Sequence, residues 1–400
     1  MMGKPKIRFK GYNEDWEQRK LGDIAEFSKG SGYSKGDLIE SGTPIILYGR
    51  LYTKYETSIS EVDTYVEAKD GSVYSKGGEV IVPASGETAE DIARAATVDK
   101  SGVILGGDLN VVSPNEDINS AFLAISISHG NSQRELAKKA QGKSIVHIHN
   151  EEIKNLVVPF PTKAEQNKIV EYFSSLDNLI TLHQRKCEET KKLKKYMLQK
   201  MFPQNGKRVP EIRFVGFTED WEQRKVKEFA IESEVKGHSG KDAKKLTVKL
   251  HNKGVYVADE KIQGSDNTQY YIRRAGQFIY GKQNFFNGAI GIVPKKLDKY
   301  ESTKDVPAFD VSSDVNVDWL YYYIARPEIY KPQEALCTGT GSKRFHVNNF
   351  YNLSLAIPKM DEQIKIKEYF VHLDNLITLH QRKYEELQKI KKFMLQNMFI

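Results

Sequence analysis

Several polar loops carry side chains that could bind nucleic acid. In the second half of the chain, residues 337–346 combine hydroxyl groups, two cations and an aromatic ring, and residues 282–288 add amides suited to bidentate contacts with adenine. In the first half, residues 48–52 and 141–147 occupy comparable places, and residues 85–88 are a further polar loop. The side chains that we predict to contact nucleic acid are Tyr48, Arg50, Tyr52, Ser85, Thr88, Lys143, Ser144, His147, Lys282, Gln283, Asn284, Asn287, Thr340, Ser342, Lys343 and Arg344.

Each of these loops could also be an ordinary surface turn. Residues 142–147 and 339–344 are the better candidates, because each precedes an extended stretch that occurs in both halves.

Motifs of catalysis and cofactor binding are missing from the sequence. Residues 237–242 lack the spacing of a nucleotide-binding loop, and no glycine-rich cofactor loop follows a strand. There is no Asn/Asp-Pro-Pro-aromatic loop of the kind that holds a flipped base. Cys187 and Cys337 have no metal-ligand spacing to another cysteine or to a histidine pair. We therefore expect no catalytic residue and no metal site, in a reduced, cytoplasmic setting.

The elements that must position the loops are repeated along the chain. An opening motif at residues 6–20 returns at 211–225, and the run Leu176–Lys186 returns letter for letter at Leu373–Lys383. The segments between the copies, 21–155 and 226–352, do not match. Identical motifs beside unlike segments suggest that Trp16 and Trp221 are structural anchors of a shared scaffold.

Each half ends in a long predicted helix. Residues 166–202 contain neither Pro nor Gly, and apolar residues recur there at alternating spacings of three and four, as in a coiled coil. The matching stripe in the second copy favours an antiparallel pair of helices. The residues predicted for the helix pair and its partner-binding surface are Leu176, Leu179, His183, Leu193, Leu373, Leu376, His380 and Leu387.

The expected fold is of the mixed α/β (α+β) class with an internal pseudo-two-fold repeat. Strands are predicted at 43–48, 78–83 and 102–105 in the first segment and at 246–250, 277–280 and 288–293 in the second, and helices at 119–140 and 317–326. The predicted domains are 1–160 and 206–357, each an opening motif with its variable segment, and 161–205 and 358–400, each a long helix.

Charge is distributed unevenly between the variable segments. Residues 21–155 carry 13 Lys and Arg against 20 Asp and Glu, whereas residues 227–350 carry 19 against 15. A nucleic-acid surface on the first segment must therefore be a local patch on an acidic domain. No apolar run approaches the roughly 20 residues that span a bilayer, so no membrane association is expected.

The repeated motifs resemble those of a known family. Each half opens with R-F-x-G-[FY]-x-E-D-W-E-Q-R-K and closes with P-x-x-x-E-Q and a helix containing L-D-N-L-I-T-L-H-Q-R-K. This pattern, over essentially the whole chain, is similar to the specificity subunit of type I restriction–modification systems. Residues 85–92 and 340–344 also resemble stretches of the family's variable domains.

The resemblance implies a division of labour. Each variable segment would be a target recognition domain that reads one half of a bipartite double-stranded DNA sequence. The helices would set the spacing and dock two methyltransferase (modification) subunits, and restriction/translocase subunits would join the full complex. The chain would have no active site and bind no cofactor, with S-adenosylmethionine and ATP/Mg held by partner subunits. Because the first segment is acidic, its docking would lean on the methyltransferase clamping the DNA.

Three other functions compete with this interpretation. A free-standing DNA-binding regulator would bind tightly without partners, and an adaptor whose segments bind proteins would show no dependence on DNA. A nuclease would need a clustered acidic metal site, which the sequence does not show.

Overall fold

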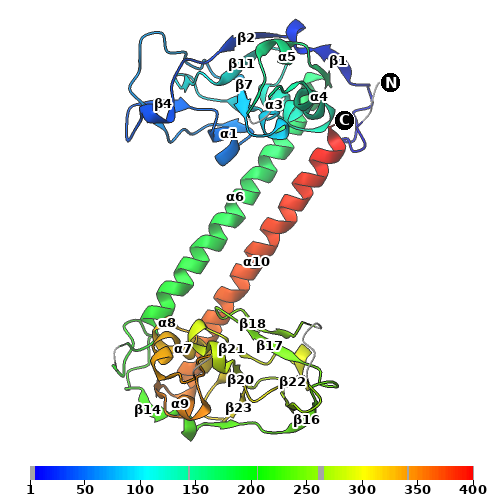
Figure 1. Cartoon of the computed structure of the whole chain (residues 1–400). Helices are drawn as coiled ribbons and strands as arrows, with labels where there is room; N and C mark the ends of the chain where they lie inside the picture. The colour runs from blue at the N-terminus through cyan, green and yellow to red at the C-terminus, as the bar shows by residue number, and fades with distance from the viewer. Residues whose placement is uncertain (1–4, 143–144, 205, 260–264, 340–341, 400) are drawn as a thin grey trace. The chain divides into compact units, whose positions relative to one another are not determined.

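The computed structural model describes residues 5–142, 145–204, 206–259, 265–339 and 342–399. The chain divides into two compact units. Unit 1 contains the residues up to His183 and those from Arg382 onward, and unit 2 contains Gln184–Gln381. Each unit thus holds one opening motif, one variable segment and part of both long helices, and both mix helices with sheets, which confirms the expected fold class (Figure 1).

Unit 1 is built on a five-stranded sheet whose strand β7 is buried along its whole length between β11 and β9. A four-stranded sheet and two short ribbons complete it. The strands predicted at 43–48, 78–83 and 102–105 are confirmed as β4, β7 and β10. In sheet order the strands are β2 (Ala25–Lys29), β11 (Leu109–Pro114), β7 (Glu79–Pro83), β9 (Ala96–Val98) and β5 (Ser58–Ile59); β10 (Ile104–Leu105), β4 (Thr43–Ile46), β6 (Tyr65–Val66) and β3 (Leu38–Ile39); β1 (Glu17–Lys20) and β13 (Val157–Phe160); β12 (Val146–His147) and β8 (Ser85–Gly86).

The helix predicted at 119–140 is two helices, because the backbone of His129 is extended. Asn119 caps the first of them by accepting a hydrogen bond from the Phe122 backbone N–H at 3.1 Å. The short helices of unit 1 are α1 (Arg50–Thr53), α2 (Ala89–Ile92), α3 (Ser120–Ser128), α4 (Gly130–Lys139) and α5 (Asn150–Lys154).

Unit 2 has smaller sheets and a more aromatic core. The three strands and the helix predicted for its variable segment are confirmed as β17, β20, β21 and α7. In sheet order its strands are β15 (Ala230–Glu232), β23 (Ala308–Val311), β20 (Phe278–Tyr280) and β21 (Ile290–Ile292); β16 (Lys236–Ser239), β19 (Gln269–Ile272) and β22 (Glu301–Ser302); β17 (Leu246–Lys249) and β18 (Gly254–Val257); β14 (Glu222–Lys225) and β24 (Ser354–Ile357). Its short helices are α7 (Val317–Ile324), α8 (Pro327–Tyr330), α9 (Val347–Tyr351) and the 3-10 helix η4 (Lys282–Asn287).

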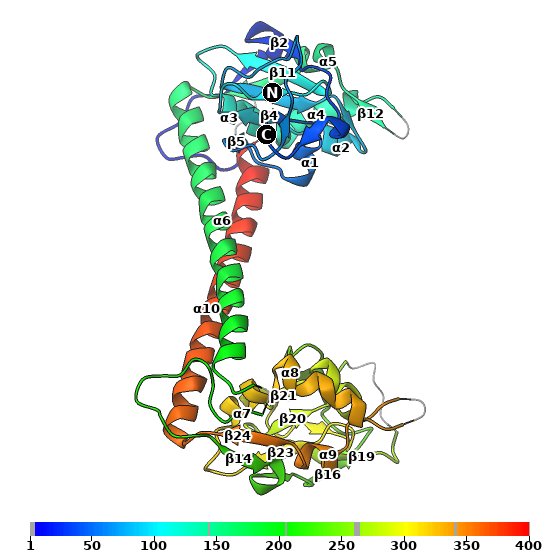
Figure 2. The ribbon, with the colours of Figure 1, turned by 90° about the vertical axis from the view of Figure 1, so that its left-hand side faces the viewer.

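The two long helices run antiparallel within each unit (Figure 2). They are α6 (Lys163–Lys200) and α10 (Met360–Met398). In unit 1, Asp177 forms an ion pair with Lys391, and the ring of Phe173 lies 6.1 Å from that of Phe399. Early residues of α6 therefore meet late residues of α10.

Unit 2 repeats this arrangement with the helices exchanged. Lys194 of α6 pairs with Asp374 of α10, which is the same pair of positions in the duplicated sequence. The thiol of Cys187, buried in the helix pair, lies 3.7 Å from the Gln381 side-chain oxygen. Cys187 is therefore a packing residue of the helix pair.

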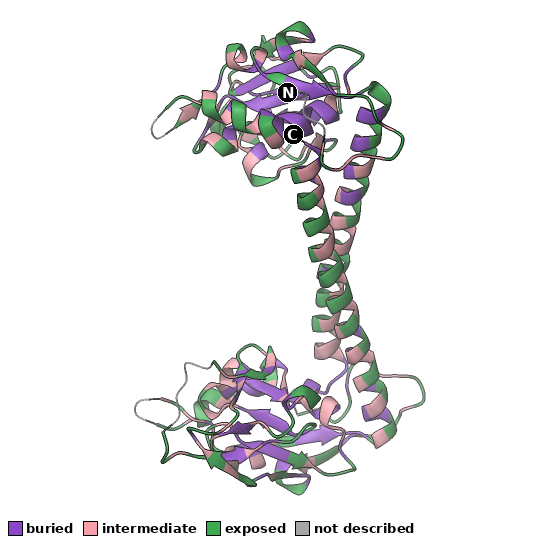
Figure 3. Ribbon diagram, turned by 90° about the vertical axis from the view of Figure 1, so that its right-hand side faces the viewer, coloured by how far each residue is buried: buried purple, intermediate pink, exposed green. Residues whose placement is uncertain are grey.

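The predicted helix seam is partly wrong. Leu176 and Leu373 are buried as expected, but Leu179 is 43% exposed and Leu193 is 45% exposed. A pair of helices covers only one narrow stripe, and that stripe is displaced by one residue from the predicted one along much of α6. His183, Leu376, His380 and Leu387 are half-buried. Figure 3 shows the resulting alternation of exposed and half-buried residues along both helices, beside buried sheets. The contacting stripe of α6 is Phe173, Leu176, Ile180, His183, Cys187, Thr190 and Lys194.

Each opening motif is an ion-paired brace on its unit. Arg8 donates two hydrogen bonds of 2.7 Å to the buried carboxylate of Glu165, at the start of α6. Arg213 does the same to Glu362, at the start of α10, at 2.6 and 2.7 Å. The strand after each motif pairs with the strand before each long helix, β1 with β13 and β14 with β24. The opening motif thus fixes the angle at which the long helix leaves its unit.

The tryptophans of the motifs anchor the cores, as predicted. Trp16 is fully buried against Phe122 and Phe399, with ring centroids 5.8 and 6.3 Å away. Trp221 is buried in the same way against Trp319 and Phe202, at 6.0 and 6.2 Å. In unit 1, Phe399 at the end of α10 therefore packs into the core beside the start of α6. In unit 2, Phe202 at the end of α6 packs into the core beside the start of α10.

Candidate nucleic-acid interface

A short hairpin projects from unit 1 between α4 and α5. Its two sides meet where the backbones of Gln141 and His147 exchange hydrogen bonds of 3.1 and 2.8 Å. Gly142 has a φ of 143°, and a Cβ there would collide with the Ile145 carbonyl oxygen. Only glycine fits this turn, because a side chain would both strain the backbone and push the strands apart.

Unit 2 contains an equivalent hairpin in front of α9. Thr338 and Arg344 exchange backbone hydrogen bonds of 3.3 and 2.9 Å. Gly339 has a φ of 133°, and a Cβ there would meet the Ser342 carbonyl oxygen. The two loops that the sequence singled out as a pair are therefore the same structural element. We call them the recognition hairpins; their described residues are 141–142 with 145–147, and 338–339 with 342–344.

Polar side chains from a neighbouring loop join each hairpin. In unit 1 the Ser85 hydroxyl lies 3.1 Å from Nδ1 of His147, and Tyr52 donates a 2.6 Å hydrogen bond to the Ser85 carbonyl. Tyr48 packs edge-on against Tyr52, at 6.0 Å between centroids. Burial of Tyr52 raises the pKa of its hydroxyl, so the hydroxyl remains a donor at neutral pH. The structure thus brings four of the predicted residues together.

In unit 2 the corresponding contact is made by a different pair of side chains. Gln283 donates a 3.2 Å hydrogen bond from Nε2 to the Ser342 hydroxyl. The backbone register is shared: Phe345 N–H donates to the Lys282 carbonyl at 2.8 Å, as Ile148 N–H donates to Ala84 in unit 1 at 3.1 Å. Ser85 and Gln283 therefore occupy equivalent positions, whereas their partners do not, because His147 corresponds to Arg344 in this register and Ser342 corresponds to Ile145.

The cations of the second hairpin are held by carboxylates. Lys343 lies 2.8 Å from Glu334, and Arg344 lies 3.2 Å from Asp305. The hydrogen bond to Glu334 raises the pKa of Lys343, which stays charged. Both ion pairs are solvent-exposed, so each contributes little to the stability of the unit. A phosphate could therefore replace either carboxylate.

The remaining predicted residues of unit 2 lie on η4. Lys282 is half-buried, and burial lowers the pKa of its ammonium group. Asn287 donates from its side-chain amide to the Asn284 side-chain oxygen at 3.1 Å. These side chains flank the hairpin rather than form its tip.

Two predicted residues of unit 1 have structural roles instead. Arg50 is buried, and its guanidinium donates to Glu56 at 2.8 Å and to Asp63 at 2.6 Å. The ion pairs turn the side chain into the protein, and its contact with DNA stays a prediction. Thr88 is the N-cap of α2 and binds Asp91, so its hydroxyl is already used. Lys143, Ser144 and Thr340 lie outside the described residues.

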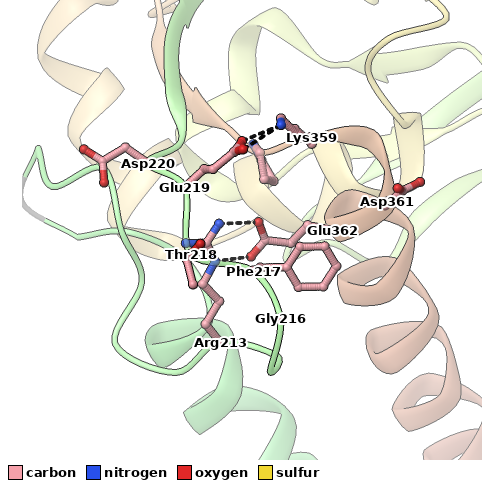
Figure 4. Close-up of a pocket in the computed structure, with 10 residues that line it drawn as sticks. Arg213, Gly216, Phe217, Thr218, Glu219, Asp220, Lys359, Asp361 and Glu362 are labelled. Atoms are coloured by element: carbon pink, nitrogen blue, oxygen red, sulfur yellow. Dashed lines mark hydrogen bonds and ion pairs between the residues drawn. The ribbon is translucent and has the colours of Figure 1, made fainter.

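The sequence reasoning missed the arginine–glutamate braces. Their partners are about 150 positions apart, 157 in unit 1 and 149 in unit 2, so no local pattern reveals them. The duplication was the available signal, because Arg8 and Glu165 each have an identical counterpart. Figure 4 shows Arg213 facing Glu362, with Lys359 facing Glu219, around a cavity of about 180 Å³. These charges already have partners, so the cavity offers no free binding group from those four residues.

The described residues hold no cluster of three or more His, Cys, Asp or Glu side chains that could bind a metal ion. In the same part of the chain, no helix combines the length and the apolar character needed to cross a membrane.

Comparison with known proteins gives one consistent family. Residues 13–192 and 218–389 each match the family described as "Type I restriction modification DNA specificity domain". The chain is 22% identical over 400 residues to the type I restriction enzyme MjaVIII specificity subunit of Methanocaldococcus jannaschii, covering 95% of this chain and 91% of that protein. It is 25% identical over 408 residues, with the same coverage, to the putative type I restriction enzyme MjaX specificity subunit of that organism.

The fold has a relative among solved structures. The S subunit of a type I restriction–modification system from M. genitalium superposes with a TM-score of 0.60 at 14% identity, covering 100% of this chain and 99% of that one. The family matches occupy most of both halves, and they agree with the resemblance of the repeated motifs. The chain therefore belongs to the type I restriction–modification DNA specificity family.

Proposed function

We propose that the two units read the two halves of a bipartite DNA target, each through its recognition hairpin and the loop beside it. One observation carries this proposal. The two units have equivalent hairpins and equivalent arginine–glutamate braces, but the polar side chains at the two hairpins differ. A serine–histidine pair in one unit and a glutamine–serine pair in the other offer different donors and acceptors to base edges. Such an arrangement suits one task performed on two different sequences.

We propose further that two copies of a methyltransferase subunit dock on the long helices, one on each unit. Exposed residues there are repeated: Leu193 and Tyr196 in unit 2 occupy the same positions as Ile390 and Phe393 in unit 1. Tyr196 is 50% exposed and Phe393 is 55% exposed. A partner bound twice explains why this surface is kept in both copies while the inserts diverge.

In this proposal the chain itself binds no cofactor. S-adenosylmethionine belongs to the methyltransferase subunits, and ATP with Mg²⁺ belongs to restriction/translocase subunits of the full complex. The hairpins orient the DNA so that a base in each half-site reaches a partner's active site.

Exchange of one insert tests the reading function. The chain with residues 226–352 replaced by the insert of another family member is expressed with its methyltransferase subunits, and methylated sites are located by sequencing. We expect one half of the target to change and the other half to remain. An unchanged pattern would overturn the proposal. Tight, specific binding of the target by the purified chain alone would favour a free-standing regulator.

A further inference from the structure

Lysines gather on one face of unit 2, at a distance from the recognition hairpin. Seven occur in two short stretches, 244–253 and 295–299, which between them contain one acidic residue, Asp298. The first stretch contains β17 and the turn that leads to β18, and the second follows β21 (Figure 1). These seven are Lys244, Lys245, Lys249, Lys253, Lys295, Lys296 and Lys299.

Two of these lysines converge on one aromatic ring. Nζ of Lys249 lies 4.2 Å from the centroid of Tyr256, and Nζ of Lys296 lies 5.9 Å from it. Tyr256 is 40% exposed. Among the described residues, neither lysine has a carboxylate within 4.0 Å. Two like charges beside one ring repel each other, and the ring offsets only part of that repulsion. An anion bound near both ammonium groups would offset that repulsion.

This face is connected to the recognition hairpin through η4. At one end of η4, the turn between β17 and β18 is fixed by His251 N–H donating to the Asn287 carbonyl at 2.9 Å. At the other end, Lys282 receives the Phe345 backbone bond and Gln283 binds Ser342. The backbone of η4 is kinked at Asn284, so its six residues span at most about 10 Å. Successive phosphates of one strand are about 3.4 Å apart along the duplex axis, so the lysines are a few base pairs from the bases read.

The side-chain chemistry suits phosphates rather than bases. Ammonium groups on flexible stems are point charges, and the amide within the two stretches, that of Asn252, donates to the Ala325 carbonyl. Two lysines of the first variable segment are instead held by carboxylates: Lys54 is bound to Asp63, and Lys69 is bound to Asp37. The net charges agree with this contrast, because the first variable segment is net acidic and the second is net basic.

We propose that Lys249 and Lys296, beside Tyr256, bind backbone phosphates next to the half-site read by unit 2, so that unit 2 is the electrostatic anchor of the chain on duplex DNA. This inference rests on the proposed reading function. It adds a contact that contributes affinity and no sequence preference, and it places most of the salt dependence in one unit.

The test uses the complex with methyltransferase subunits and three forms of the chain. These are the wild type, Lys249→Gln/Lys296→Gln, and the charge-matched control Lys207→Gln/Lys227→Gln, whose lysines flank the opening motif of unit 2 and are exposed. Affinity for a target duplex and for a scrambled duplex is measured at several salt concentrations. We expect the first variant to lower the slope of log affinity against log salt by about 1.8, since each lost phosphate contact removes roughly 0.9. Both duplexes should lose affinity by the same factor, on the order of ten-fold or more at 0.1 M salt.

Three results would overturn the inference. The slope and the affinities of the variant could equal those of the control. The loss could affect only the target duplex, which would make these lysines readers of bases. The variant could fail to bind methyltransferase in the absence of DNA, which would make the face a contact with an acidic protein surface. Failure of the reading function itself would appear separately, as a wild-type complex that does not distinguish the target from the scrambled duplex.

Discussion

Ser85 and Gln283 occupy equivalent places but offer different groups to a ligand. Ser85 is joined to His147, a donor or acceptor according to its tautomer, and Gln283 is joined to Ser342. A hydroxyl accepts and donates one bond at a time, whereas an amide can bind adenine with both of its groups. At the residue scale, the difference between the two half-sites is expected to begin with this pair.

Substitution of each residue should therefore affect one half-site only. Gln283→Ala is expected to relax preference at a base of the half-site read by unit 2, at a cost of about 1–3 kcal/mol of discrimination. Ser85→Ala should act on the other half-site and serves as the reciprocal control. Methylation rates on targets with each base replaced in turn measure this. Loss of preference in both halves from one substitution would contradict it.

A buried histidine gives unit 1 its own pH dependence. His129 lies between α3 and α4, and burial lowers the pKa of its imidazole, with Lys391 and Arg94 adding to the effect and Asp177 opposing it. Because the folded protein disfavours the charged imidazole, the neutral histidine makes its full contribution to stability above the unfolded-state pKa of about 6.5. That contribution is lost as the pH falls below this value.

Replacement by an uncharged residue should flatten that dependence. The free energy of unfolding of unit 1 is expected to fall between pH 7.5 and 5.5 in the wild type, and to fall less in His129→Gln. Unit 2 has Arg326 at the corresponding place, and its own pH dependence, to which the pKa of His238, raised by the hydrogen bond to Glu301, contributes, should be the same in the wild type and in the variant. Hydrogen exchange resolved by unit separates the two. Equal pH dependence of wild type and variant would show that other groups govern unit 1.

At the scale of elements, the opening motifs decide how firmly each long helix is fixed to its unit. The carboxylate of Glu362 is buried and held by Arg213, whereas that of Glu219 is exposed and bound to Lys359 (Figure 4). Removal of one partner of a buried pair leaves an uncompensated charge, and removal of one partner of an exposed pair does not.

Glu362→Ala should therefore destabilise unit 2 by about 3–5 kcal/mol, while Glu219→Ala should cost about 1 kcal/mol or less. Urea unfolding of the full chain, followed by hydrogen exchange in residues of unit 2, provides the measurement. If both substitutions had the same small effect, the brace would be dispensable for the unit.

The long helices carry the surface proposed for partners. Tyr196→Asp places a charge on the exposed face of unit 2, and Phe393→Asp places one at the same position in unit 1. Each substitution is expected to reduce the number of bound methyltransferase subunits from two to one, because a charge on an apolar contact must be desolvated. Native mass spectrometry gives the stoichiometry, with Lys192→Gln as a control on the same helix. Two bound subunits in both variants would exclude this face.

At the scale of the whole molecule, both long helices continue from one unit into the other. If they set the distance between half-sites, one heptad added to each helix should lengthen the unread spacer. Seven residues add roughly 10 Å, which corresponds to about three base pairs. Sequencing of methylated sites reports the spacer length. A folded variant that kept the original spacer would refute the role of the helices as a ruler.

The sequence by itself determined the duplication, the long helices, the mixed α/β class and the family, because repeated motifs and helical periodicity are local or can be compared within the chain. It also identified the two recognition hairpins as a pair, since both precede the repeated linker strand. Tertiary structure alone decided which residues face inward. Arg50 is withdrawn by two carboxylates, and Leu179 lies beside the helix seam and not in it. Burial and ion pairing depend on segments far apart in the chain, as in the contact of Arg8 with Glu165, and no spacing rule connects such partners.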